Sequence, residues 1–193
     1  MPSRSVEVVI ETPAGSRNKY LYDEGRGAFR LHKLLPLGAA FPFDFGFVPE
    51  TLAEDGDPLD VLVLSDEPLF PGCLVPVRLL GVIEAEQKER RKAAIRNDRL
   101  IAKPETAKIH ARERTLADLP AGVLDQLEHF FVAYNRAEAR TFTPLARRGP
   151  EAALRLLEQA RRAYGSRATA AAFRSGLAEG RRKARTPSRP GKL

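Results

Sequence analysis

Hydrophobic residues recur at every second position over much of the first hundred residues, a pattern that predicts β-strands. Val6, Val8 and Ile10 show it first, and Pro76 inside a later apolar run predicts an edge position or a bulge there. The strands that we expect span residues 6–11, 19–22, 28–34, 61–64, 74–83 and 99–102. We expect the second and third of them to form a hairpin, and we interpret the basic residues 88–96 as a loop.

Two helices are expected late in the chain. Asp118 as a cap and Pro120 in the first turn are predicted to open the first, and Pro150 is predicted to open the second. The apolar residues at helical spacing are Val123, Leu124, Leu127, Phe130, Phe131 and Tyr134 in the first, and Ala153, Leu154, Leu157, Ala160 and Tyr164 in the second. Short strands followed by helices predict a mainly β fold with α (α+β): a small closed, OB-like β-barrel flanked by two α-helices.

A stripe of aromatic residues lies between the third and fourth expected strands. Phe41, Phe43, Phe45 and Phe47 fall on one side of an extended segment. A phenylalanine stripe of period two is typical of a core, and we interpret it so rather than as a stacking platform.

The chain length and the distribution of charge predict one domain followed by a tail. A chain of 193 residues suits a single compact domain, which we place at residues 1–165. Residues 165–193 carry eight Lys or Arg and one acid, so they hold the whole formal net charge of +7. We expect residues 166–193 to be a basic, disordered tail, with a weak helix at 168–178 at most. A single Cys and the lack of a long apolar run predict a cytoplasmic protein that does not enter a membrane.

An acidic turn precedes the apolar run at residues 61–64. Between Leu34 and Val77 there are eight acids and no Lys or Arg. Four of these acids lie in residues 54–60. Crowded carboxylates take up protons, spread into water or bind hard divalent cations. We favour cation binding over a solvated turn, because Gly56 and Pro58 fix the turn. The residues of the turn do not match the positions of an EF-hand calcium loop, so that type of site is excluded.

The turn Asp55-Gly-Asp-Pro-Leu-Asp60 resembles the D-G-D-P-x-D signature of the soluble family I inorganic pyrophosphatases. Further matches run in family order over residues 6–164. They are Val8-Val-Ile-Glu-Thr-Pro13, Lys19-Tyr20, Phe41-Pro-Phe-Asp-Phe-Gly-Phe47, Pro71-Gly72, Asn97-Asp-Arg-Leu-Ile-Ala102 and His129-Phe-Phe-x-x-Tyr134.

The resemblance implies Mg²⁺-dependent hydrolysis of pyrophosphate to two orthophosphates by a metal-activated water. It implies that Asp55 and Asp60 bind Mg²⁺, that Glu11 serves a further metal, and that Asp57 accepts the proton of the attacking water. Hydrolysis also requires basic groups to hold phosphate. The residues expected to do so are Lys19, Lys33, Arg99 and the Tyr134 hydroxyl. The resemblance implies a homo-oligomer as well, hexamers being common among bacterial relatives.

Several positions depart from the family pattern. Lys33 stands where Arg is common, Phe45 where a phosphate-binding Tyr is usual, Leu21 where an acid is expected, and Asn135 where Lys is expected. The usual D-x-K is Asn97-Asp98-Arg99 here. Two alternatives follow: Asp98 takes the metal-ligand role, or Asn97 contributes a neutral oxygen. The acid normally upstream of this motif aligns either with Glu86 or within the insertion.

Two other functions remain open at this point. The departures favour a catalytically weak or inactive protein that binds phosphorylated ligands. A basic tail on a barrel is also compatible with nucleic-acid binding. Nucleic acid would then contact the tail alone, because residues 1–164 have no net charge.

Overall fold

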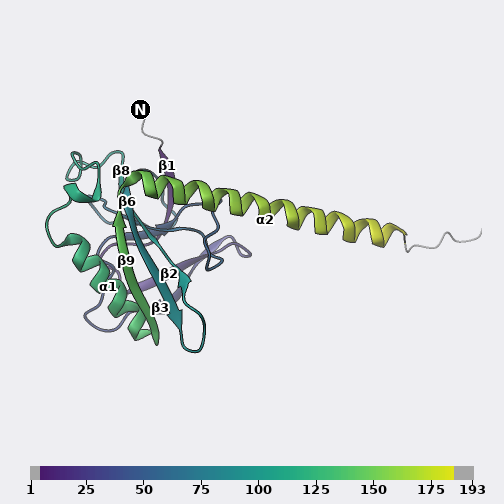
Figure 1. Cartoon of the computed structure of the whole chain (residues 1–193), viewed down its shortest axis with the longest axis horizontal. Coiled ribbons are helices and arrows are strands. Elements are labelled where there is room, and N and C mark those ends of the chain that lie inside the picture. Colours follow the sequence, from purple (N-terminus) through teal and green to yellow (C-terminus); the bar gives the residue numbers. More distant parts are fainter. Residues whose placement is uncertain (1–4, 185–193) are drawn as a thin grey trace, which may run out of the picture.

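A computed structural model describes residues 5–184, with side chains up to residue 169, and shows a β-barrel from which one long helix projects (Figure 1). Five strands form the barrel, in the order β1-β4-β5-β8-β6, and β1 also pairs with β6 to complete the ring. These strands are β1 (Val6–Thr12), β4 (Asp44–Phe47), β5 (Asp60–Val63), β6 (Leu74–Glu89) and β8 (Arg99–Pro104). The ring is not evenly closed, because β1 pairs with β6 through residues 6–9 and with β4 through residues 9–12. The fold is thus the mainly β barrel with helices that the sequence predicts.

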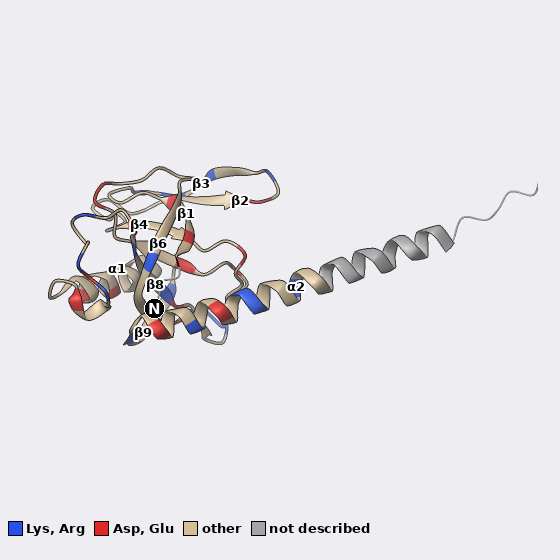
Figure 2. Ribbon diagram, turned by 90° about the horizontal axis from the view of Figure 1, so that it is seen from above, with Lys and Arg blue, Asp and Glu red and all other residues tan. Residues whose placement is uncertain are grey.

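Additional strands lie around the barrel. The expected hairpin is confirmed as β2 (Asn18–Asp23) and β3 (Ala28–Leu34), which form an antiparallel two-stranded sheet. The far half of β6 pairs with β7 (Ile95–Arg96) and β9 (Arg140–Arg148). Seen from above, the hairpin lies on one side of the barrel and the last helix leaves from the other (Figure 2).

Three strand predictions need correction. β6 continues to Glu89 and so includes the first residues of the segment interpreted as a loop. β6 has register shifts between Leu79 and Gly81 against β8 and between Glu84 and Ala85 against β9, and no bulge at Pro76, where it pairs with β1 only. β9 was not predicted at all, because Phe142 is its only fully buried residue and Pro144 interrupts its sequence. An edge strand of this kind lacks the alternation that identifies a strand in the sequence.

The helices cover two separate parts of the core. The 3₁₀ helix η1 (Leu116–Asp118) precedes α1 (Val123–Ala137), whose Leu127 and Phe131 are buried. The start of α1 differs from the prediction, because Gly122, rather than Asp118, is its N-cap. Asp118 instead accepts hydrogen bonds from the backbone of Arg114 and Thr115.

The helix α2 (Pro150–Ala184) begins at the predicted proline and is much longer than expected. Its first turns bury Ala153, Leu157 and Ala160 against the barrel core. It then continues without a break through Gly165, where we expected the domain to end. The helix α2 includes residues 168–178, where we expected a weak helix, and residues 180–184, where we expected disorder; residues 185–193 of the expected tail lie outside the described part.

Two hydrophobic clusters fill the interior. One joins β1, β5, β6 and β8 to the start of α2, and the other joins β4 and the opposite faces of β5, β6 and β8 to α1. Phe41 and Phe45 are buried in the second cluster, which confirms the core interpretation for these two members of the aromatic stripe. Within residues 5–184, no helix is both long and apolar enough to cross a membrane.

Gly46 is expected to be indispensable for the β1–β4 pairing. A Cβ at this position would lie 2.1 Å from the carbonyl oxygen of Val9, which is backbone and has no freedom to move aside. Gly46→Ala should lower the free energy of unfolding by about 3 kcal/mol or more. Gly165→Ala, in open space on α2, should raise it by about 0.5–1 kcal/mol. Urea unfolding of both variants tests this, and equal stabilities would contradict the close approach of β1 and β4.

Candidate active site

The acidic loop connects β4 to β5 and is held by hydrogen bonds across its base. The backbone N–H of Val48 donates to the carbonyl of Leu59 over 3.0 Å. The Thr51 hydroxyl donates to the Val48 carbonyl and accepts from the Leu59 N–H over 2.9 Å. Gly56 has φ of +93°, a conformation that favours glycine. The loop is therefore a fixed turn that presents its carboxylates at one end of the barrel.

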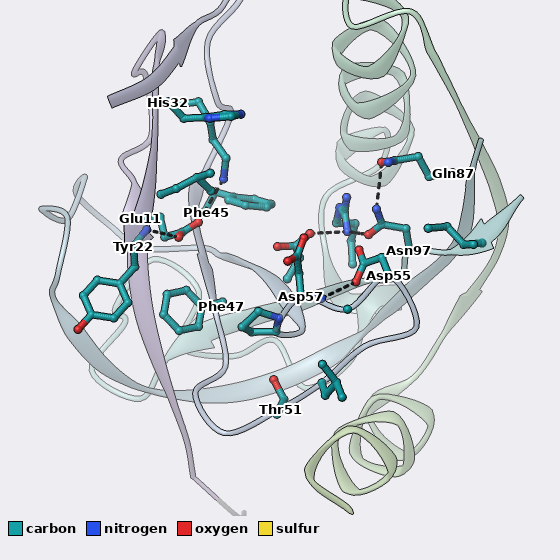
Figure 3. A pocket seen from close by; sticks show the side chains of 18 of the residues that line it. Glu11, Tyr22, His32, Phe45, Phe47, Thr51, Asp55, Asp57, Gln87 and Asn97 are labelled. Carbon is teal, nitrogen blue, oxygen red and sulfur yellow. Dashed lines mark hydrogen bonds and ion pairs between the residues drawn. The ribbon is translucent and has the colours of Figure 1, made fainter. Parts of the chain in front are cut away.

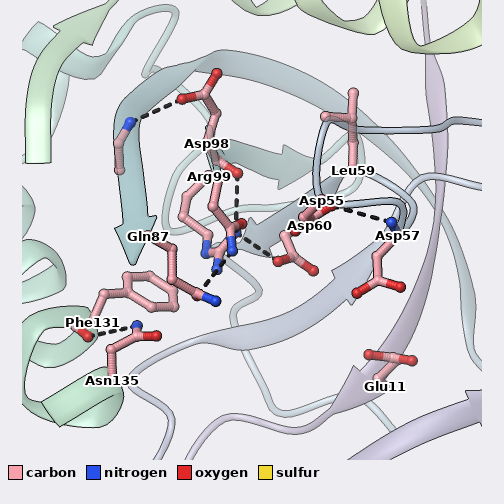
Figure 4. Close-up of polar contacts among 12 residues, drawn as sticks. Glu11, Asp55, Asp57, Leu59, Asp60, Gln87, Asp98, Arg99, Phe131 and Asn135 are labelled. Carbon is pink, nitrogen blue, oxygen red and sulfur yellow. Dashed lines mark hydrogen bonds and ion pairs between the residues drawn. The ribbon is translucent and has the colours of Figure 1, made fainter. Parts of the chain in front are cut away.

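Asp55 and Asp57 carry carboxylates whose environment disfavours the charged form. The Asp57 N–H donates to Asp55 Oδ1 over 3.1 Å. Burial, followed by repulsion from Asp60 and Asp57, raises the pKa of Asp55 to about 6 although that hydrogen bond opposes the change. Burial and repulsion from Asp60 also raise the pKa of Asp57. Figure 4 shows the Asp57 and Glu11 carboxylates facing each other.

Asp60 stands at the start of β5 and is paired with Arg99 at the start of β8. Asp60 Oδ2 lies 2.6 Å from Arg99 Nη1. The guanidinium carbon of Arg99 lies 5.1 Å from the ring centroid of Phe131 and 5.6 Å from that of Phe142. Arg99 is 5% exposed, so its charge is fixed in a dry setting beside the acidic loop.

A second charged pair, Glu11 with Lys19, forms the opposite wall. Glu11 Oε2 lies 3.2 Å from Lys19 Nζ, and Glu11 Oε1 accepts the Tyr22 N–H over 2.8 Å. Burial raises the pKa of Glu11 and lowers that of Lys19, and their mutual attraction opposes both shifts. The Lys19 ammonium also lies 4.0 Å from the centroid of the Phe45 ring. Phe45 thus supplies an aromatic face to Lys19 where the family has a hydroxyl.

Lys33 and Tyr134 lie together on a further side. Lys33 Nζ is 3.0 Å from Glu138 Oε1 and 4.4 Å from the centroid of the Tyr134 ring. Tyr134 stacks on Phe130 with the ring centroids 5.8 Å apart. Lys33 joins β3 to α1 through these contacts.

The acidic loop and the charged side chains of both walls line one open cavity of about 1200 Å³. Figure 3 shows Glu11, Asp55 and Asp57 at this cavity. The cavity brings together eight predicted site residues: Glu11, Lys19, Lys33, Asp55, Asp57, Asp60, Arg99 and Tyr134. Acids from the loop and bases from β2, β3 and β8 therefore face a shared space, although they are far apart in the sequence.

Asp98 is the predicted residue that the structure does not bring to the cavity. Its Oδ1 accepts the backbone N–H of Ala85 over 2.9 Å, and it pairs with Arg96 at 2.8 Å. Figure 4 shows its carboxylate turned away from the acidic loop. We therefore leave Asp98 out of the proposed metal ligands. Asn97 lines the cavity instead, with its side-chain oxygen accepting a hydrogen bond from Arg99.

Two other departures from the family pattern have structural consequences. Leu21 lines the cavity with an apolar side chain. Asn135 is 1% exposed and donates to the Phe131 carbonyl over 2.9 Å, so its amide is committed within α1. Neither residue offers a charge to a phosphate.

The sequence analysis missed several residues that line the cavity. They are Tyr22, Arg30, Gln87, Lys92, Arg140, Tyr164 and Arg167. Gln87 had one usable signal, because the inward positions Ile83 and Ala85 continue to it at spacing two. The others lie on exposed or half-buried parts of β2, β3, β9, α2 and the β6–β7 hairpin, where no sequence pattern marks them.

The carboxylates have the donor chemistry of a Mg²⁺ site without forming a closed one. Across residues 5–184, no three His, Cys, Asp or Glu side chains are gathered closely enough to hold a metal ion. Asp55, Asp57 and Asp60 nevertheless offer the oxygen ligands that Mg²⁺ prefers. A cation among them would offset the cost of burying these charges and their mutual repulsion, the two causes that raise the pKa of Asp55 and Asp57. On these grounds the residues fit Mg²⁺.

Comparisons with known proteins agree on one family. A family model described as inorganic pyrophosphatase matches residues 8–165. The inorganic pyrophosphatase of Methanosarcina acetivorans is 36% identical over 85% of this chain and 95% of its own length. The inorganic pyrophosphatase of Thermus thermophilus is 43% identical over 70% of this chain and 74% of its own.

Solved structures give the same result for the fold. A crystal structure of the Thermus thermophilus inorganic pyrophosphatase superimposes with a TM-score of 0.78 at 37% identity, covering 85% of this chain and 92% of that one. The Helicobacter pylori inorganic pyrophosphatase gives a TM-score of 0.76 at 34% identity, covering 84% of this chain and 95% of that one.

The raised pKa of Asp55 predicts how the stability of the metal-free protein depends on pH. An aspartate whose pKa is higher in the folded state stabilises the fold when protonated, and this contribution is lost as pH rises through about 6. Asp55→Asn should therefore raise the free energy of unfolding in EDTA by about 1 kcal/mol at pH 7.5, after allowance for solvent screening. The gain should shrink to nothing near pH 3.5. Denaturant unfolding at both pH values measures it.

Glu54→Gln, an exposed acid on the same loop, is the matched control for Asp55→Asn. It should change stability by no more than about 0.5 kcal/mol at either pH. A destabilised Asp55→Asn protein at pH 7.5 would contradict the unfavourable setting of this carboxylate.

Proposed function

The chain belongs to the inorganic pyrophosphatase family, and from this premise we propose that it hydrolyses inorganic pyrophosphate to two orthophosphate ions with Mg²⁺. The observation that carries this proposal is the shared cavity, in which the acids of one loop face bases from three strands. A phosphoanhydride needs both sets, because its charge must be held while water is made nucleophilic.

Asp57 is the proposed general base. Its raised pKa brings the carboxylate closer to the working range of a proton acceptor near neutral pH. A carboxylate oxygen of Asp57 takes a proton from the attacking water, whose oxygen forms a bond to one phosphorus while the bridging oxygen leaves with the other phosphate. The Asp57 carboxylate is only partly covered by its neighbours and the residue remains exposed on the loop, so water has access to it.

The phosphate groups are held by side chains on the other walls. Lys19, Lys33 and Arg99 supply positive charge, and the Tyr134 hydroxyl supplies a donor. Lys33 lacks the two-pronged geometry of an arginine, whereas Arg99 gains it where the family has lysine. The negative charge on the leaving phosphate is therefore stabilised by groups that β2, β3, β8 and α1 already hold in place.

Asp55 and Asp60 are the proposed Mg²⁺ ligands, with Glu11 serving a further, substrate-associated metal. Mg²⁺ bound by these groups supplies positive charge to the phosphates and makes a water molecule more acidic. Glu11 and Asp60 are already paired with Lys19 and Arg99, so each protein cation holds a carboxylate in place.

The family relationship also supports proposals for the oligomeric state and the cellular compartment of the protein. We propose that the protein acts as a homo-oligomer, such as a hexamer, and that it works in the cytoplasm. The single cysteine is free, as suits a reducing compartment.

Asp57→Asn tests the proposed base. An amide cannot accept the proton, so the rate of phosphate release from pyrophosphate with Mg²⁺ should fall by about 100-fold or more. Glu54→Gln keeps the base and removes a neighbouring acid, and it should retain near-parental activity. Equal release by Asp57→Asn and the parent protein would contradict the role of Asp57.

Removal of Mg²⁺ tests the proposed cofactor. EDTA should abolish phosphate release, and added Mg²⁺ should restore it. Mg²⁺ at 100 times its dissociation constant should also stabilise the fold by about 2.7 kcal/mol, seen as a higher melting temperature. An Asp55→Asn/Asp60→Asn protein should lose most of that stabilisation. Calorimetric binding of orthophosphate without any turnover of pyrophosphate would instead support a catalytically inactive, phosphate-binding protein.

A further inference from the structure

Arg99 uses only part of its guanidinium for contacts with the protein. Its Nη1 faces three acceptors: Asp60 Oδ2, the side-chain oxygen of Asn97 and the carbonyl of Asp98. Its Nη2 has no partner among residues 5–169, and its buried Nε has none either. Arg99 lines the cavity, so the N–H groups of Nη2 remain available to a ligand there while Nη1 contacts the protein.

Asn97 is the residue that fixes this orientation from behind. Its Oδ1 accepts from Arg99, while its Nδ2 donates to Gln87 Oε1 over 3.0 Å. A side-chain amide can accept from a guanidinium and donate to a second amide at once, which neither a carboxylate nor an ammonium can do. Asn97 is 7% exposed and Gln87 9%, so water competes little for these bonds.

The backbone around the two amides gives them a rigid support. The N–H of Asn97 donates to the carbonyl of Ala85 over 2.9 Å, and the N–H of Ala85 donates to the Asp98 carboxylate. Ala85 and Gln87 both belong to β6, which pairs with β7 and β9 at this point. The hydrogen bonds from Gln87 through Asn97 to Arg99 therefore link the far half of β6 to the edge of the acidic loop. Figure 3 shows the bond between Gln87 and Asn97.

We propose that Asn97 and Gln87 are positioning residues that orient the Arg99 guanidinium, so that Nη1 holds Asp60 and Nη2 is left to bind a substrate phosphate. In this arrangement Asn97 is not a metal ligand, because its oxygen is committed to Arg99. The inference rests on the proposed function only in taking phosphate as the ligand of Arg99.

The test measures orthophosphate binding by calorimetry in Mg²⁺, because orthophosphate is not turned over. Asn97→Leu keeps the side-chain size and removes both hydrogen bonds, so the dissociation constant for orthophosphate should rise about tenfold. In an Arg99→Ala background the same substitution should have no further effect, since Asn97 acts through Arg99. A further loss of fivefold or more in that background would overturn the proposal.

Mg²⁺ binding in the absence of phosphate separates positioning from ligation. Loosening Arg99 leaves Asp60 less neutralised, so Asn97→Leu should bind Mg²⁺ as tightly as the parent protein or more tightly. A tenfold weaker Mg²⁺ affinity would identify Asn97 as a ligand and overturn the proposal.

Two further variants serve as a second route and a control. Gln87→Met leaves Asn97 in place and should weaken orthophosphate binding about threefold, again only when Arg99 is present. If Asn97→Leu fails to fold, this variant decides whether the two amides position Arg99. Asn135→Leu removes another buried amide, one committed within α1, and should leave orthophosphate binding within twofold. An effect of Asn135→Leu equal to that of Asn97→Leu would overturn the proposal by showing a general loss of structure.

The same variants distinguish this inference from the proposed function. A parent protein that binds orthophosphate and releases none from pyrophosphate contradicts hydrolysis, and the binding comparisons still decide the positioning role. An active parent protein whose Asn97→Leu variant binds orthophosphate normally overturns the positioning role alone.

Discussion

The pairing of β5 with β8 is the constraint on which the site depends. These strands run parallel with Val61 beside Leu100, so Asp60 and Arg99 emerge together at the same end of the barrel. The register thus places a guanidinium 2.6 Å from the carboxylate that closes the acidic loop. A shift of β8 by one residue against β5 would turn the Arg99 side chain to the other face of the sheet, away from Asp60. The loop can hold three aspartates in a small space because this positive charge is fixed beside it.

Buried carboxylates on the two walls of the cavity are stabilised in different ways. Glu11 and Lys19 are both nearly buried, and burial shifts the pKa of each toward its neutral form. Each is stabilised as an ion chiefly by the other, so removal of one partner would leave a buried charge unpaired. Asp55 and Asp57, on the loop, have no ion-pair partner among the side chains of residues 5–169, and their carboxylates are the part of the site most in need of a cation.

The elements that border the cavity come from distant parts of the chain. The hairpin β2–β3 and the middle of α2 lie on different sides of the barrel (Figure 2), and both contribute lining residues. The acidic loop also contacts α2 directly, because the Leu52 N–H donates to the Ala160 carbonyl over 3.0 Å. The long helix is therefore part of the support of the loop rather than an appendage to the domain.

The sequence alone predicted the barrel strands, the β2–β3 hairpin, the start of α2 and the acidic turn. Alternation, turn residues and local charge act over a few neighbours, so they can be read from the chain. It also identified eight of the residues that line the cavity, through the family motif that contains or flanks them. Residues without a local pattern, such as the edge strand β9 and the continuation of α2 through Gly165, were missed or predicted wrongly.

The folded chain alone reveals which of Asp98 and Asn97 lines the cavity, because two adjacent residues on an extended chain point to opposite sides. The register of β8 against β5 and β6 turned Asp98 toward Ala85 and Asn97 toward the cavity. Gln87 likewise became a neighbour of Asn97 only through the bend of β6 into β7. Hydrogen bonds between residues far apart in sequence depend on that pairing, and no stretch of sequence contains it.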